Sequence, residues 1–81
     1  MVTIYSTTTC PYCKMLKEFL QDHGIGYTEK LVDVDELARE EMAAASGGFL
    51  GVPFMVIDTE AGRQTVIGFD KAKISEFLHL N

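Results

Sequence analysis

The run Phe54-Met55-Val56-Ile57 constrains the fold more than any other segment of this chain. Four consecutive apolar residues that follow a proline are typical of a strand that is buried on both faces. Such a strand requires helices packed against each side of its sheet. The chain has 81 residues, of which 47% are hydrophobic, and this is enough for one small core. We therefore expect a single domain over residues 1–81 with an α/β fold.

Periodicity and capping residues predict the other elements of this domain. The expected strands are β-branched or apolar runs, and they span Val2–Tyr5, Tyr27–Val32, Phe54–Ile57 and Gln64–Ile67. The expected helices span Pro11 to about His23, Glu36 to about Ala45, and the segment that Asp70 caps. In the order β-α-β-α-β-β-α, the first two strands are parallel and the last two form a hairpin. We expect a four-stranded mixed sheet with helices on both faces.

Charge and hydropathy exclude two classes of partner. Seven Lys and Arg residues against twelve Asp and Glu give a formal net charge of −5, which is the wrong sign for binding nucleic acid. The longest uncharged stretch, Met42–Ile57, contains glycines and a proline and is shorter than the roughly 18 residues of a membrane span. The chain also opens without a basic leader or an apolar signal region. We therefore expect a cytoplasmic protein that binds neither nucleic acid nor membranes.

Cys10 and Cys13 carry the most specific chemistry in the chain. Two cysteines cannot form the multi-bridge framework of a small secreted domain, and in a cytosolic chain the C-x-x-C spacing indicates metal binding or redox chemistry. A structural zinc site needs four ligands, and the chain adds only His23 and His79, each near an expected helix end. Redox chemistry with no metal site is therefore the main hypothesis, and a zinc site or an inert cysteine pair are the alternatives.

The position of the two cysteines gives them different roles. Cys10 lies where the loop after the first strand meets a helix N-terminus, and Pro11 suits the first helical turn. Unpaired N–H groups and the helix dipole favour negative charge there, so they stabilise a thiolate on Cys10. Cys13 lies one turn further along the same side, close enough for a disulfide and more buried. We expect Cys10 to attack a substrate and Cys13 to resolve the product.

Pro53 opens the buried Phe54–Ile57 strand, although it lacks the N–H that a sheet ladder needs. A cis Val52–Pro53 bond would turn the Val52 backbone toward neighbouring groups, leaving its N–H and C=O free to pair with an extended, peptide-like substrate. An ordinary trans proline at the start of a strand is the alternative. The residues themselves leave both conformations open.

Three motifs, in this order and spacing, resemble those of the glutaredoxin branch of the thioredoxin-like superfamily, over essentially the whole chain. Cys10-Pro11-Tyr12-Cys13 matches the dithiol glutaredoxin active site. Gly51-Val52-Pro53 resembles the family's Thr-Val-Pro, which carries a cis proline, and Val66–Asp70 is similar to the segment that holds the γ-glutamyl end of glutathione. The resemblance implies a thioredoxin-like fold and a substrate or glutathione site that includes Tyr12, Val52, Pro53, Gly68, Phe69 and Asp70.

The chain departs from the glutaredoxin pattern at three places. Gly68-Phe69 stands where glutaredoxins usually carry Gly-Gly, Gly51 replaces a threonine, and residues 6–9 include no lysine for the glycine carboxylate of glutathione. Gly48–Pro53 and Gly68-Phe69 instead resemble the NrdH-type redoxins, which thioredoxin reductase reduces and which supply ribonucleotide reductase. A mixed bacterial subgroup called YruB-type is similar in both respects. The resemblance thus leaves the electron donor open.

Phe69 and Asp70 each have a structural alternative to a role in binding. The Phe69 ring would narrow the glutathione groove or form an apolar docking patch together with Phe49, or else pack in the core under the last helix. Asp70 is either a helix N-cap or a contact to an incoming amine. Tyr12 is expected to be exposed beside the thiolate.

These observations predict a thiol–disulfide oxidoreductase that acts as a monomer. Its expected substrates are disulfide-containing or glutathionylated proteins, and its expected electron donor is glutathione or thioredoxin reductase. No tightly bound cofactor is expected, and glutathione is a possible co-substrate. One alternative is a dedicated electron donor to a single partner. Another is a dimer that holds an iron–sulfur cluster through Cys10 and glutathione, against which Pro11 argues because cluster-binding members often carry glycine there.

Overall fold

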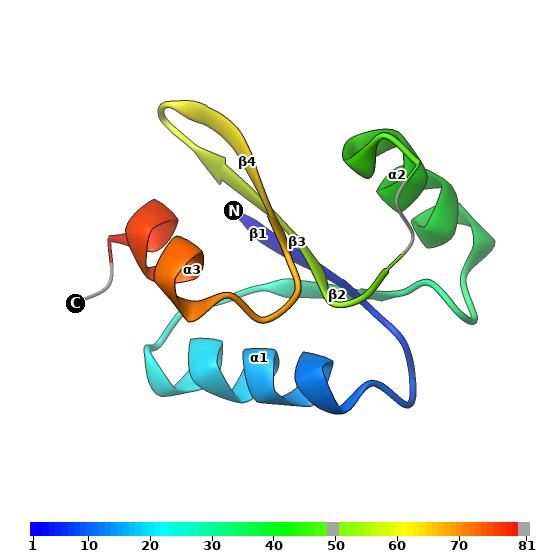
Figure 1. The fold of residues 1–81 in the computed structure, drawn as a ribbon, viewed down its shortest axis with the longest axis horizontal. Helices are drawn as coiled ribbons and strands as arrows, with labels where there is room; N and C mark the ends of the chain where they lie inside the picture. Colours follow the sequence, from blue (N-terminus) through cyan, green and yellow to red (C-terminus); the bar gives the residue numbers. More distant parts are fainter. Residues whose placement is uncertain (49–50, 80–81) are drawn as a thin grey trace.

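The computed structural model describes residues 1–48 and 51–79 of the chain. Within these residues the elements are β1 (Val2–Ser6), α1 (Pro11–Asp22), β2 (Thr28–Leu31), α2 (Glu36–Ser46), β3 (Phe54–Thr59), β4 (Gly62–Ile67) and α3 (Lys71–Leu78). Figure 1 shows their arrangement. The predicted order β-α-β-α-β-β-α is confirmed. None of the helices in these ranges is both long enough and apolar enough to cross a membrane.

The described strands form one four-stranded sheet in the order β2-β1-β3-β4. β1 pairs in parallel with β2 and antiparallel with β3, and β3 pairs antiparallel with β4. The predicted mixed sheet is therefore confirmed. In this pairing Tyr5 lies opposite Phe54, and Phe54 lies opposite Ile67. The carboxyl ends of β1, β2 and β4 thus meet the start of β3 at one edge of the sheet, which is the edge where the loop to Cys10 begins.

Two apolar clusters hold helices on opposite faces of the sheet. The cluster under α1 and α3 contains Val2, Ile4, Leu16, Leu20, Met55, Ile57, Val66 and Ile74. The cluster under α2 contains Tyr5, Met42, Phe54 and Val56. Successive residues of β3 alternate between the two clusters, so this strand is buried on both faces, as its apolar run predicts. Figure 1 shows α1 and α3 on one side of the sheet and α2 on the other.

Capping residues set the ends of the helices. The Asp35 carboxylate accepts a hydrogen bond from the Leu37 N–H at 3.0 Å at the start of α2. The Asp70 carboxylate accepts one from the Lys73 N–H at 3.1 Å at the start of α3, so the N-cap interpretation of Asp70 is confirmed. Gly47 ends α2 in the left-handed conformation, with φ 72°, as the glycine-rich stop predicts.

The β3–β4 hairpin is longer than the sequence predicts. β3 continues to Thr59 and β4 begins at Gly62, so the turn expected from Asp58 to Gly62 shortens to residues 60–61. Polar side chains extend the ladder to its tip, because Thr59 Oγ1 donates to the Gly62 carbonyl at 2.8 Å and Arg63 Nε donates to Asp58 at 3.1 Å. β2 is shorter than expected and spans Thr28–Leu31.

Candidate active site

Cys10 ends the loop that follows β1 and forms the N-cap of α1. Its backbone is extended, with φ −90° and ψ 109°, and its sulfur accepts a hydrogen bond from the Cys13 N–H at 3.1 Å. Pro11 takes the first helical position, where its missing N–H costs no helical hydrogen bond. The Cys10 sulfur therefore lies at the positive end of the α1 dipole, an environment that favours a thiolate.

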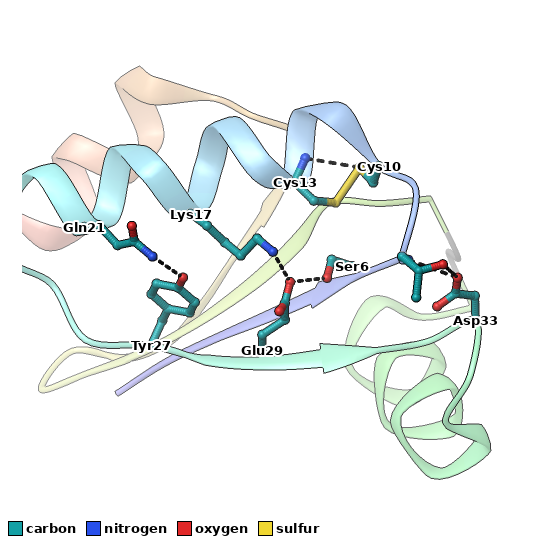
Figure 2. Close-up of polar contacts among 9 residues, drawn as sticks. Ser6, Cys10, Cys13, Lys17, Gln21, Tyr27, Glu29 and Asp33 are labelled. Carbon is teal, nitrogen blue, oxygen red and sulfur yellow. Dashed lines mark hydrogen bonds and ion pairs between the residues drawn. A yellow bond between two sulfur atoms is a disulfide. The ribbon is translucent and has the colours of Figure 1, made fainter.

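Cys10 and Cys13 are joined by a disulfide, with their Cα atoms 5.2 Å apart, as Figure 2 shows. Cys13 is 1% exposed, whereas Cys10 is only half-buried. The predicted difference in burial between the two cysteines is confirmed, and it leaves Cys10 the more accessible of the two sulfurs. Tyr12, between them, is 60% exposed, also as expected.

The other two sequence motifs lie at the same edge of the sheet as the cysteines. The Val52–Pro53 peptide bond is cis, which confirms that alternative over the trans one. Pro53 is buried just before β3, and its carbonyl accepts a hydrogen bond from the Gly68 N–H at 2.8 Å. Gly68 has φ +77°, a left-handed conformation that favours glycine. This hydrogen bond ties the start of β3 to the end of β4.

Phe69 lies between α1 and the start of α3. Its half-buried ring meets the Phe19 ring edge-on, with centroids 5.8 Å apart, and Lys71 Nζ lies 5.4 Å from its centroid. The ring packs at the border of the apolar cluster under α1 and α3. It also lines a shallow cavity of about 190 Å³ with Met15, Phe19 and three charged residues, so the ring is packed on one side and accessible on the other. Phe49, the other half of the expected docking patch, lies outside the described residues.

A cavity of about 440 Å³ opens beside Cys10. It is lined by the loop residues 7–9 and by Cys10, Pro11, Lys14 and Lys17. Asp33, which follows β2, holds this loop by accepting hydrogen bonds from the Thr8 N–H at 3.0 Å and from Thr8 Oγ1 at 2.7 Å. Both hydrogen bonds lower the pKa of the Asp33 carboxyl below its usual value, and the bond from the Thr8 hydroxyl has the larger effect. Sequence reasoning missed this contact, although parallel pairing of β1 and β2 brings both loops to one edge.

A second contact that sequence reasoning missed joins α1 to the sheet. Ser6 is fully buried, and its hydroxyl donates to Glu29 Oε2 at 2.8 Å. Lys17 Nζ lies 2.7 Å from the same oxygen. The hydrogen bond from Lys17, more than that from Ser6, lowers the pKa of Glu29 below its usual 4.5 against the opposing effect of burial. The register of β1 with β2 is the feature that indicates this contact, because it places Glu29 opposite Ile4, a residue that faces α1.

The described residues give no support to a zinc site. In these ranges no three His, Cys, Asp or Glu side chains gather as metal ligands. His23 follows α1 at the end of the helix far from the cysteines, and its Nδ1 lies 2.8 Å from the Phe19 carbonyl oxygen. His79 ends α3 in a left-handed conformation with φ 56°.

Comparisons with known proteins agree on one family. A family model described as glutaredoxin matches residues 2–61. An uncharacterized glutaredoxin-like 8.6 kDa protein in a rubredoxin operon of Clostridium pasteurianum is 40% identical over 78 residues, which cover 96% of this chain and 97% of that protein. The glutaredoxin-like protein NrdH of Lactococcus lactis subsp. cremoris is 34% identical over 58 residues, which cover 72% of this chain and 78% of that protein.

A solved structure supports the fold over nearly the full length of the chain. A mutant of the thioredoxin-like protein BC3987 matches with a TM-score of 0.84 and 30% identity, covering 99% of this chain and 96% of that one. The thioredoxin-like fold implied by the sequence motifs is therefore confirmed. The residues matched by the family model include both cysteines and Pro53, whereas the segment from Val66 to Asp70 lies beyond them.

Proposed function

This chain belongs to the glutaredoxin family, and on that premise we propose that it reduces protein disulfides, glutathione mixed disulfides or both through Cys10 and Cys13. The observation that carries the proposal is the asymmetry of the cysteine pair. Cys10 is half-buried at the N-cap of α1, and Cys13 is buried one turn inside the same helix. The two sulfurs are already joined as a disulfide in the structure.

The proposed reaction is a two-step thiol–disulfide exchange. The Cys10 thiolate attacks one sulfur of the substrate disulfide, forms a mixed disulfide and releases the other substrate sulfur as a thiolate. Cys13 then loses its proton and attacks the Cys10 sulfur, which breaks the mixed disulfide and releases the second substrate thiolate. Two electrons have passed from the cysteine pair to the substrate, and the Cys10–Cys13 disulfide remains. A donor must return these two electrons.

A second candidate function, a dedicated electron carrier that thioredoxin reductase reduces, is favoured by Phe69. Its ring occupies the position where glutaredoxins usually have a glycine, and it packs on Phe19. The Gly68 N–H already donates to the Pro53 carbonyl, so it is not available to a carboxylate of glutathione. An accessible aromatic ring on this side of α1 suits a protein partner better than a small charged peptide.

The donor is tested by recycling the oxidised protein with NADPH, using either glutathione with glutathione reductase or thioredoxin reductase alone. Turnover with glutathione only indicates a glutaredoxin in function, and turnover with thioredoxin reductase only indicates an NrdH-like carrier. Cys10→Ser abolishes disulfide reduction with either donor. Cys13→Ser abolishes dithiol turnover while release of glutathione from mixed disulfides continues through Cys10. Full activity of Cys10→Ser would overturn the proposed function.

Further properties follow as proposals from the same site. We propose that Tyr12, Val52, Pro53 and Phe69 contact the substrate or glutathione, and that Asp70 adds a contact to an incoming amine besides capping α3. We also propose that the protein acts as a cytoplasmic monomer without a tightly bound cofactor, with glutathione as a co-substrate where it is used. The proposed substrates are disulfide-containing or glutathionylated proteins. NMR chemical-shift changes on forming a mixed disulfide with such a substrate should map to these residues.

A further inference from the structure

A group of polar contacts among Ser6, Lys17 and Glu29 interrupts the apolar interface between α1 and the sheet. The interface is otherwise formed by side chains such as Ile4 and Leu16, each fully buried. Glu29 Oε2 accepts a hydrogen bond from the Ser6 hydroxyl at 2.8 Å and lies 2.7 Å from Lys17 Nζ. In the described part of the chain, Ser6 is the one buried residue of polar type. Desolvating a hydroxyl and an ion pair costs free energy that apolar residues would not cost, so this location suggests a function.

The polar group lies on the side of α1 that carries the cysteines. Lys17 follows Cys13 by four residues, so both project from the same side of the helix. Long helical side chains lean toward the helix N-terminus, and Lys17 lines the cavity that opens beside Cys10. Figure 2 shows Lys17 reaching from α1 to Glu29 on the side of the helix where the disulfide also lies. Its ammonium therefore lies on the cysteine side of α1 in a partly buried interface, where charges are screened less than in water.

We propose that the Lys17–Glu29 pair sets the stability of the active-site thiolate and thereby the reduction potential of the disulfide, with Lys17 stabilising the thiolate and Glu29 limiting that effect. The inference rests on the proposed function only in taking Cys10 as the reacting thiol. Reduction adds two electrons and two protons to the disulfide and gives two thiols, and Cys10 then releases its proton to solvent. A cation that stabilises the thiolate favours the reduced form and makes the disulfide more oxidising, and a carboxylate paired with that cation opposes the effect.

The other charged groups around the cysteines stay constant in the test. Lys14 of α1 lines the cavity with Cys10. Asp33 is hydrogen-bonded to Thr8 in the loop before Cys10, and Asp70 caps α3 at the same edge of the sheet. The positive end of the α1 dipole is unchanged as well, because Lys17 lies beyond the first turn of the helix and Glu29 lies on β2. Any change in the thiolate therefore reports the altered pair.

The experiment compares Glu29→Gln and Lys17→Met with matched substitutions in an ion pair on the opposite face of the sheet. Glutamine keeps the shape of the glutamate side chain and an oxygen acceptor while removing the charge, and methionine keeps much of the lysine stem. Lys30 and Glu41 form an ion pair of the same length, 2.7 Å. Because Lys30 follows Glu29 in the strand, it projects to the face that α2 covers. Lys30→Met and Glu41→Gln thus repeat both charge changes away from the cysteines.

The reduced parent and its variants are alkylated with iodoacetamide over a range of pH, and mass spectrometry identifies the modified cysteine. On the acid side of the titration we expect Glu29→Gln to react at Cys10 about two- to fivefold faster than the parent, and Lys17→Met to react slower by a similar factor. In glutathione redox buffers Glu29→Gln becomes half-reduced at a more oxidising ratio than the parent. The double variant returns to about the parent rate, and the two control variants stay there.

Equal alkylation rates in Glu29→Gln, Lys17→Met and the two control variants would overturn the inference. A double variant that fails to return toward the parent rate would overturn it too, because a structural change rather than charge would then explain the single variants. Circular dichroism and thermal unfolding establish that each variant is folded. Alkylation and redox equilibrium need no enzymatic turnover, so a parent protein that reduces no substrate would refute the proposed function and not this inference.

Discussion

Replacing Phe69 by alanine tests packing and partner binding in one variant. The half-buried ring contributes about 1 kcal/mol through burial. Its edge-on contact with Phe19 at 5.8 Å adds about 0.5 kcal/mol or more. The cation–π contact with Lys71 at 5.4 Å adds about 0.5 kcal/mol. The sum of about 2 kcal/mol corresponds to a fall in Tm of about 8–16 °C for a domain of this size.

The functional assay for Phe69→Ala is run well below its Tm and compares two substrates. Reduction of a small disulfide depends on Cys10 and should be unchanged, whereas KM for the protein partner or donor should rise. Phe77→Ala is the matched control, because Phe77 packs on the same apolar cluster but lines the cavity near the hairpin tip, away from the cysteines. A change in Tm of less than about 2 °C would refute the packing estimate. An equal loss of turnover with both substrates would refute the docking role.

Three further predictions follow from the charges and from the start of α1. The pKa of Glu29 is lowered mainly by Lys17, so its contribution to stability is present above the unfolded value of 4.5 and is lost as the pH falls through the folded value. Urea unfolding should therefore show that the parent loses more free energy of unfolding than Glu29→Gln between neutral pH and about pH 3; parallel curves would contradict this. Asp33→Ala should speed hydrogen exchange of the Thr8 amide in NMR, since that amide donates to Asp33 at 3.0 Å, and unchanged exchange would mean that the bond does not hold the loop. Because Pro11 directly follows the first cysteine, anaerobic reconstitution with iron, sulfide and glutathione should leave a colourless monomer, and a brown dimer would contradict it.

The layers of the fold were predictable because one strand carries the information for both faces. Phe54 and Val56 join the cluster under α2, and Met55 and Ile57 join the cluster under α1 and α3. An uninterrupted apolar run is what this alternation requires when helices cover both sides. The N-cap position of Cys10 was equally predictable, since Pro11 is well suited to a first helical turn.

The polar contacts around the cysteines were not predictable in the same way. Thr8 and Asp33 are separated by 25 positions, and Ser6 and Glu29 by 23. Neither pair forms a local pattern, and each depends on the exact pairing of β1 with β2. The prediction of the hairpin tip was wrong for a related reason. Asp58 has weak strand propensity, and both Asp58 and Thr59 are held in the ladder by partners across the turn.

The pairing of β1 with β2 also determines which charged side chain of β2 lies on the same side of the sheet as the cysteines. Ile4 lies opposite Glu29 and Tyr5 lies opposite Lys30, so the carboxylate faces α1 and the ammonium faces α2. A slip of one residue would exchange the two faces and bring Lys30 to the side of Lys17. Each charged residue of β2 is held in place by an opposite charge from the helix on its own face, at 2.7 Å in both cases. The contacts that fix the strand register therefore also fix the charge on the α1 side of the sheet, so a variant that weakens them should change stability and redox behaviour together.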